Sequence, residues 1–182
     1  MALFTVDSNN TFGKSVQESG RYNVKVLDSS ELKAAKSTGN EMLVLNYEVL
    51  DGDYAGGRVL YDNFVWNPDN LDQSEKRFNT LLVAANVPDG TPINSIQDVL
   101  RGIINKQLSI KTEWVKSDYN GKWNLSVKAY DKLDADGSKP DGKKRPDDDS
   151  AKKSSDPFNH APQTDPFATG MPVDISDDDL PF

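Results

Sequence analysis

Apolar and polar side chains alternate clearly in the first strand-like stretch of the chain. In residues 21–27 the apolar positions Tyr22, Val24 and Val26 are separated by polar or charged ones, and a period of two is typical of a strand with one covered face. The run 42–50 instead carries β-branched, aromatic and aliphatic side chains on both faces. We therefore expect a half-covered strand followed by a central strand.

Turn-forming residues separate the remaining strands and join them in pairs. The glycine- and aspartate-rich segment 51–57 leads into a third strand pattern over residues 58–66, which predicts a hairpin. Two further alternating runs, 107–115 and 122–130, flank an Asn-Gly turn. Asn-Gly between alternating runs is the strongest short hairpin signal, so a second hairpin is expected there.

Helical periodicity occupies the stretch between the third and fourth predicted strands. Asn70 followed by Gln73 predicts a capped helix whose apolar stripe includes Phe78, and a shorter helix is expected between Ser95 and Gly102. The order of elements is that of a mainly β, five-stranded OB-fold barrel with a helix between strands 3 and 4. Another small antiparallel sheet packed on a helix is the alternative.

The periodic pattern ends near residue 133. Residues 1–133 hold 15 Lys and Arg against 17 Asp and Glu, whereas residues 134–182 hold 6 against 12 and contain few aliphatic side chains. Such a segment cannot offset the entropy lost on ordering, so we expect it to be disordered. The chain divides into a domain over 1–133, a disordered linker over 134–173 and an acidic tip over 174–182.

Residues that usually carry catalysis or bind metals are scarce. The chain has no cysteine, and its one histidine, His160, lies in the low-complexity tail, where fixed catalytic geometry is not expected. The turn at 51–53 resembles a calcium loop, but Ala55 stands at a ligand position and Asp62 replaces the bidentate glutamate. We expect neither an enzyme nor a bound metal or cofactor.

Targeting and membrane-spanning segments can be recognised from the start of a chain and from its apolar runs. The first residues are not a basic stretch followed by an apolar run, and no segment approaches the roughly 18 apolar residues that span a bilayer. We expect no membrane partner and a cytoplasmic protein.

Aromatic residues and cations alternate in the last predicted hairpin. Binding of single strands without sequence preference requires aromatic faces on which bases stack, and cations that follow the phosphates. If the Asn-Gly pair at 120–121 forms a two-residue turn, Lys111 lies opposite Tyr130 on the polar side of the hairpin, together with Lys128. Trp114 then lies on the other side and is better explained as a core residue.

An OB-fold barrel binds its ligand across strands two and three, between the loops that join strands one to two and four to five. Both predicted loops carry cations, and the third strand adds side chains whose facing is ambiguous. Any one of these lysines taken alone is better explained as an ordinary solvated surface charge. The residues expected to bind single-stranded DNA are Lys33, Lys36, Asn40, Arg58, Trp66, Lys111, Lys116, Tyr119, Lys122, Trp123, Lys128 and Tyr130.

The end of the chain carries the most specific motif. The final residues Asp177, Asp178, Asp179, Leu180, Pro181 and Phe182 resemble the acidic tip of bacterial single-stranded-DNA-binding proteins. Segments 36–43, 51–52 and 54–58 are similar to a bacteriophage family of small single-strand-binding proteins, often catalogued as a domain of unknown function. These resemblances imply a phage protein of the host cytoplasm whose tip recruits replication or recombination proteins.

Three hypotheses follow for the function. The first is a protein that coats and protects single-stranded DNA, with RNA binding as a subordinate possibility because stacking hardly distinguishes the two sugars. The second is a strand-annealing recombination protein, which would accelerate pairing of complementary strands. The third is an acidic protein-interaction adaptor without affinity for DNA. The sequence leaves open whether the chain forms a homo-oligomer.

Overall fold

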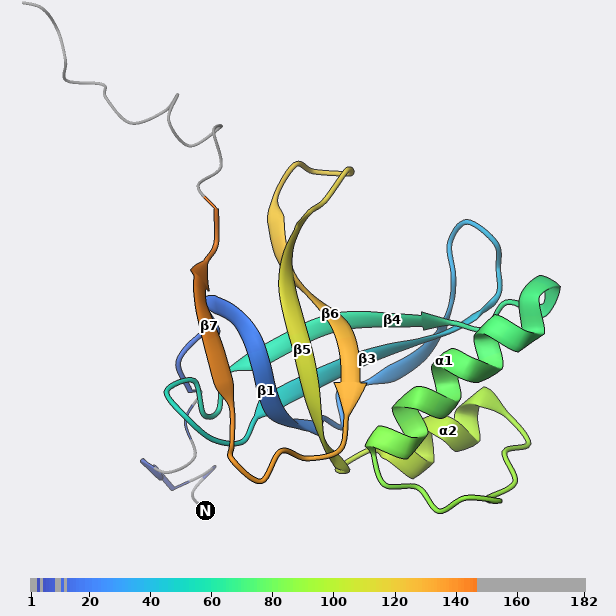
Figure 1. Cartoon of the computed structure of the whole chain (residues 1–182), viewed down its shortest axis with the longest axis horizontal. Coiled ribbons are helices and arrows are strands. Elements are labelled where there is room, and N and C mark those ends of the chain that lie inside the picture. The colour runs from blue at the N-terminus through green and yellow to red at the C-terminus, as the bar shows by residue number, and fades with distance from the viewer. Residues whose placement is uncertain (1–2, 4, 9–10, 12, 147–182) are drawn as a thin grey trace, which may run out of the picture. The chain divides into compact units, whose positions relative to one another are not determined.

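The strand β1, Glu18–Val26, holds the sheet together because it has three partners (Figure 1). Along one edge it pairs with β5, Gln107–Lys116, and along the other it pairs first with β7, Lys139–Lys144, and then with β3, Glu41–Val49. All these pairings are antiparallel. The computed structural model describes residues 3, 5–8, 11 and 13–146.

The remaining elements extend this sheet and cover it. The strand β2, Glu31–Ala34, and the strand β4, Arg58–Val65, both pair with β3, while β6, Trp123–Asp131, pairs with β5. A short 3₁₀ turn, Pro68–Asn70, precedes α1, Leu71–Ala84, and α2 spans Ile96–Ile103. The fold is therefore an open antiparallel sheet of seven strands with two helices.

Local signals in the sequence explain where the helices begin. The Asn70 side chain accepts a hydrogen bond from the Gln73 amide and donates one to the Gln73 side chain, which is the predicted capping pair. Ser95 caps α2 by accepting from the Asp98 amide. From α1, Phe78 packs edge-on against Phe64 of β4, with 5.6 Å between ring centroids.

The expectation of a closed five-stranded barrel with a helix between strands 3 and 4 is wrong. The loop after β1 contains the additional short strand β2, so the helices lie between the fourth and fifth strands. A further strand, β7, follows the predicted domain. Within residues 13–146 no ladder of hydrogen bonds joins β4 to β6, and the sheet stays open at that seam.

The ordered part of the chain continues beyond residue 133. Residues 134–146, which the sequence places in the linker, contain β7 and belong to the compact unit that ends at Pro146. This unit, residues 1–146, holds 19 Lys and Arg against 20 Asp and Glu, and the remaining residues hold 2 against 9. The rest of the expected linker and the acidic tip, residues 174–182, lie outside the described residues.

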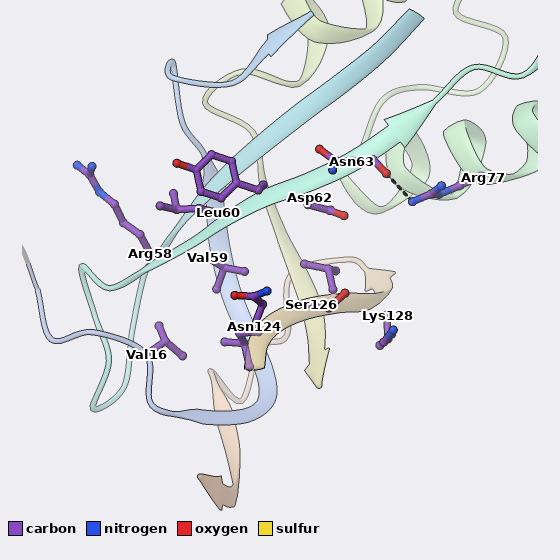
Figure 2. A pocket seen from close by; sticks show the side chains of 13 residues that line it. Val16, Arg58, Val59, Leu60, Asp62, Asn63, Arg77, Asn124, Ser126 and Lys128 are labelled. Carbon is purple, nitrogen blue, oxygen red and sulfur yellow. Dashed lines mark hydrogen bonds between the residues drawn. The ribbon is translucent and has the colours of Figure 1, made fainter. Parts of the chain in front are cut away.

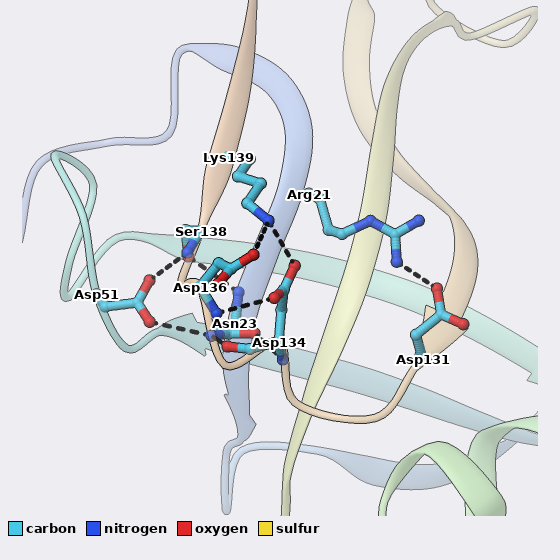
Figure 3. Close-up of polar contacts among 8 residues, drawn as sticks. All are labelled: Arg21, Asn23, Asp51, Asp131, Asp134, Asp136, Ser138 and Lys139. Atoms are coloured by element: carbon cyan, nitrogen blue, oxygen red, sulfur yellow. Dashed lines mark hydrogen bonds and ion pairs between the residues drawn. The ribbon is translucent and has the colours of Figure 1, made fainter.

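A polar network fastens the approach to β7 onto β1 (Figure 3). The buried Asn23 amide group donates to the Asp51 carboxylate and to the Asp134 carbonyl, at 3.1 and 2.8 Å. Its side-chain oxygen accepts from the Asp134 amide, and the Ser138 amide donates to Asp51. Hydrogen bonds from Ser138 and Asn23 outweigh burial and lower the pKa of the Asp51 carboxyl. We call these four residues the β7 latch.

Candidate nucleic-acid interface

A groove of about 650 Å³ runs along the open seam between β4 and β6 (Figure 2). Val59 and Asp62 point from β4 toward β6, and Asn124 and Ser126 point from β6 toward β4. Because β4 and β6 are not hydrogen-bonded to each other, the groove separates their facing edges, although Val59 and Asp62 themselves are largely buried.

Three cations line this groove. Arg58 comes from the start of β4, Lys128 from β6 and Arg77 from α1. The Arg77 guanidinium lies 4.5 Å from the centroid of the Phe64 ring and donates a hydrogen bond to the Asn63 carbonyl at 2.8 Å. The cations give the groove a positive rim suited to phosphates.

Arg77 also connects the groove to the turn before β3. A second depression, of about 270 Å³, is lined by Arg77 together with Thr38 and Asn40. The predicted residue Asn40 thus lines a depression that shares Arg77 with the groove. Arg77 was not among the predicted site residues, because a lone arginine on the polar side of a helix has no motif around it.

The floor of the groove contains a buried carboxylate. The hydroxyls of Tyr47 and Tyr130 each donate to Oδ2 of Asp62 at 2.7 Å. Burial raises the pKa of Asp62, against the lowering effect of the two hydroxyls and of Arg77. Burial, with the adjacent Asp62, also raises the pKa of both tyrosines. At neutral pH the tyrosines act as hydrogen-bond donors.

A bulge in the β3–β4 pair places an exposed tyrosine beside the groove. Leu45 pairs with Asp62 and Tyr47 with Val59, so Asn46 faces two residues of β4. One of them, Tyr61, has a φ of +63° and is 73% exposed. The Asn46 side chain accepts from the Tyr61 amide at 3.1 Å. Tyr61 lines the groove and was not predicted, because its strand pattern gives no sign of the bulge.

A second bulge corrects the predicted register of the last hairpin. Thr112 pairs with Val127 but Lys111 pairs with Ala129, so one extra residue, Lys128, is accommodated in β6. Beyond a bulge the alternation of faces reverses. Tyr130 therefore lies opposite Ile110, on the core side, and packs against Phe64. The prediction that Tyr130 faces Lys111 on the polar side is wrong.

The outer half of the same hairpin, Trp114 to Leu125, projects beyond the rest of the sheet (Figure 1). Lys116 pairs with Trp123 and Trp114 pairs with Leu125, which places all four side chains on one face. Both tryptophans are partly exposed, and the Trp114 indole donates to the Lys143 carbonyl of β7 at 3.0 Å. We call Trp114, Lys116 and Trp123 the hairpin arm.

The turn of this hairpin is longer than predicted. The Ser117 amide donates to the Lys122 carbonyl, so residues 117–122 form the connection rather than Asn120 and Gly121 alone. Tyr119 at the tip is 97% exposed, and Lys122 is exposed beside it. These two predicted residues extend the hairpin arm with an aromatic face and a cation.

The other predicted site residues lie apart from the groove. Lys33 is ion-paired with Glu31 on β2, and Lys36 is exposed in the following turn. Lys111 pairs with Glu113 at 3.2 Å and is not among the groove residues.

Trp66 lies in a separate pocket. It packs edge-on against Phe78, with 5.5 Å between ring centroids, and shares that pocket with Glu41 and Glu75. The two carboxylates make this pocket unsuitable for phosphates.

The described part of the chain offers neither a metal site nor a membrane-spanning helix. Residues 13–146 and the few described before them contain no group of three or more His, Cys, Asp or Glu placed to hold a metal ion. No helix in this part is long and apolar enough to cross a membrane.

Comparison with known families gives one match. Residues 4–140 fit the model of a family described as "Protein of unknown function (DUF669)". The match spans the sheet, both helices and the first residues of β7. A search of curated proteins finds none that matches the chain.

Proposed function

The chain belongs to the DUF669 family, and we propose that it is a single-stranded-DNA-binding protein. One observation carries the proposal: the groove between β4 and β6 has a rim of cations and is bordered by the exposed aromatic side chain of Tyr61. Single strands are bound by this combination, in which bases stack on rings and phosphates meet Lys or Arg. Coating and protection of the strand require no catalytic residue.

The hairpin arm supports a path longer than the groove itself. Leu125 lines the groove and pairs with Trp114, so the hairpin arm adjoins the groove through this pair. At the opposite end of the groove, Arg77 also lines the depression that contains Thr38 and Asn40. We propose that the strand runs along these three surfaces, from the hairpin arm to the turn before β3.

The charge distribution agrees with a nucleic-acid ligand. Residues 1–146 are close to neutral, with 19 cations against 20 anions, and the acidic excess of the chain lies in residues 147–182. The groove can therefore attract phosphates even though the whole chain has a formal net charge of −8.

We further propose that the sheet is an opened variant of the OB-fold. The long strands β1, β3, β4, β5 and β6 follow one another in the order expected of that fold, and only the pair β4 with β6 is missing. Binding does not depend on closure, because the open seam is the proposed site.

The biological setting is proposed from resemblance. The motifs in residues 36–58 are similar to those of a phage single-strand-binding family, and residues 177–182 resemble the acidic tip of bacterial single-stranded-DNA-binding proteins. We propose that the protein acts in the host cytoplasm during phage replication or recombination. Its tip would present aspartates to a basic cleft and Phe182 to an apolar pocket of a partner.

Titration of the full-length protein tests the function. A fluorescent thymine homopolymer and a duplex of equal length are compared at several salt concentrations. We expect tight binding to the single strand, quenching of tryptophan fluorescence, and a log–log salt dependence with negative slope. Absence of binding to the single strand at low salt would discard the proposal and leave the adaptor hypothesis.

A matched pair of charge variants tests the location of the site. Lys116→Gln removes a cation from the hairpin arm, and Arg101→Gln removes an exposed cation from α2, outside the groove. We expect Lys116→Gln to weaken binding and reduce the salt slope by about 0.7. Arg101→Gln should bind as the parent protein does. Equal effects of the two variants would contradict this placement of the strand.

A further inference from the structure

The floor of the groove is suited to a particular base. We propose that Asp62 accepts a hydrogen bond from the exocyclic amino group of a base, which gives the protein a preference for cytosine over uracil at one position of the bound strand. The inference rests on the proposed binding of single-stranded DNA and adds a specificity to it.

Asp62 is placed to meet a ligand. Its side chain points into the groove from β4 (Figure 2), although the residue is only 9% exposed. Both tyrosine hydroxyls donate to Oδ2, and among the described residues no hydrogen bond reaches Oδ1. Among the described residues the Ser109 hydroxyl is the one buried side-chain polar atom without a partner, so Oδ1 of Asp62 is not sealed from solvent. A carboxylate oxygen that is open to the groove can accept a hydrogen bond from a ligand.

The charges of the groove determine which part of a nucleotide can reach this oxygen. A phosphate would be repelled by the Asp62 carboxylate, whereas Arg58 and Lys128 on the rim attract it. The strand is therefore expected to lie with phosphates toward the rim and bases toward the floor. A base edge then meets Oδ1.

The chemistry of base edges decides between the pyrimidines. Cytosine presents an amino donor at position 4, which a carboxylate can accept. Uracil presents a carbonyl oxygen at the same position, which would place two acceptors against each other. The Asn124 and Ser126 side chains, which line the same groove, can both donate and accept, so they do not discriminate. Asp62 is thus the residue that sets the preference.

Homopolymers of deoxycytidine and deoxyuridine test the inference, because neither base carries a methyl group. The full-length protein is titrated with equal lengths of both at neutral pH, in competition against one labelled strand. A correctly paired base edge discriminates by about 1 to 3 kcal/mol, which is a ratio of about 5- to 150-fold. We expect deoxycytidine to bind more tightly by a factor in this range.

The variant Asp62→Asn tests the residue. The amide has nearly the same shape and can still bond to the two tyrosine hydroxyls, but its NH₂ can donate to the uracil carbonyl. The ratio of the affinities for the deoxycytidine and deoxyuridine homopolymers should fall to about one or invert. Asp131→Asn, which alters an exposed carboxylate paired with Arg21, serves as control and should keep the parent ratio.

The outcomes separate the two proposals. If the parent protein binds neither homopolymer, the proposed function fails. If it binds both equally, single-strand binding stands and the inference is overturned. The inference is likewise overturned if the Asp62→Asn variant, shown by circular dichroism to be folded, keeps the parent ratio of affinities.

If the Asp62→Asn variant does not fold, the parent protein is titrated with a homopolymer of the 2-pyrimidinone deoxynucleoside, a base that lacks the amino group. Binding as tight as that of deoxycytidine would overturn the inference.

Discussion

Tyr61 combines an unfavourable backbone conformation with an exposed side chain. A φ of +63° in a residue with a Cβ costs roughly 1 to 2 kcal/mol, and a ring that is 73% exposed offers little packing in return. The bulge also makes the edge strand β4 less able to pair with another chain. That role needs the bulge but no aromatic side chain, and on the proposed function we expect the Tyr61 ring to stack with a base.

The variant Tyr61→Asn separates stability from binding. Asparagine tolerates positive φ, so the free energy of unfolding should stay the same or rise by up to about 1 kcal/mol. Loss of one stacking ring should weaken single-strand binding by about 5- to 150-fold. Thermal melting and strand titration measure the two effects. A variant that binds as the parent does would remove Tyr61 from the interface.

The facing of single residues was predictable only where the strands are regular. Alternation correctly places Tyr22, Val24 and Val26 in the core, where all three are fully buried. It fails for Tyr130, because one inserted residue reverses every face beyond it. It gives no sign of Tyr61, since the bulge there depends on the Asn46 side chain from another strand.

At the scale of elements, β7 depends on contacts made far away in the sequence. All six of its residues are exposed, and its composition of Lys, Pro, Asp and Gly disfavours strands. What holds it is the β7 latch together with a close approach to Gly20, where a Cβ would lie 2.6 Å from the Lys139 carbonyl oxygen.

The variant Gly20→Ala should displace β7. The added methyl group meets backbone at 2.6 Å, and the φ of +144° is one that alanine rarely adopts. We expect a loss of roughly 1 to 3 kcal/mol in the free energy of unfolding. Gly102→Ala is the control, because a Cβ there has open space within the helix α2 and should stabilise by about 0.5 to 1 kcal/mol. Denaturant unfolding measures both, and an unchanged Gly20→Ala variant would contradict the close approach.

Elements with strong local signals were predictable and weakly marked ones were not. The two capped helices and the strands at 21–27, 42–50, 58–66, 107–115 and 122–130 are confirmed with small shifts in their bounds. The strands β2 and β7 were missed, because four or six polar-rich residues pair only when a neighbouring strand offers a free edge. They raise the number of strands from five to seven, while the sheet is open because β4 and β6 do not pair.

At the scale of the whole molecule, the separation of charge has a consequence for binding. Residues 147–182 carry 9 acidic residues against 2 basic ones, and they are tethered to a domain with a cationic groove. On the proposed function, we expect this tethered polyanion to compete with DNA for the same cations. The competition weakens as salt screens it.

Deletion of residues 174–182 should therefore tighten binding of single-stranded DNA. The gain is expected to be largest at low salt and to shrink as the ionic strength rises. Titration of both proteins with the same thymine homopolymer at two salt concentrations measures it. Equal affinities at low salt would show that the acidic tip does not compete for the groove.

The three partners of β1 also determine when the sheet can be completed during synthesis. β1 leaves the ribosome early, but β5 and β7 follow only about 90 and 120 residues later. Pairings between such distant segments form slowly, and strand edges that wait for a partner are prone to aggregate. The nascent chain therefore carries an incomplete sheet until residue 144 has emerged, so a ribosome that stalls earlier would expose an edge for chaperones to protect.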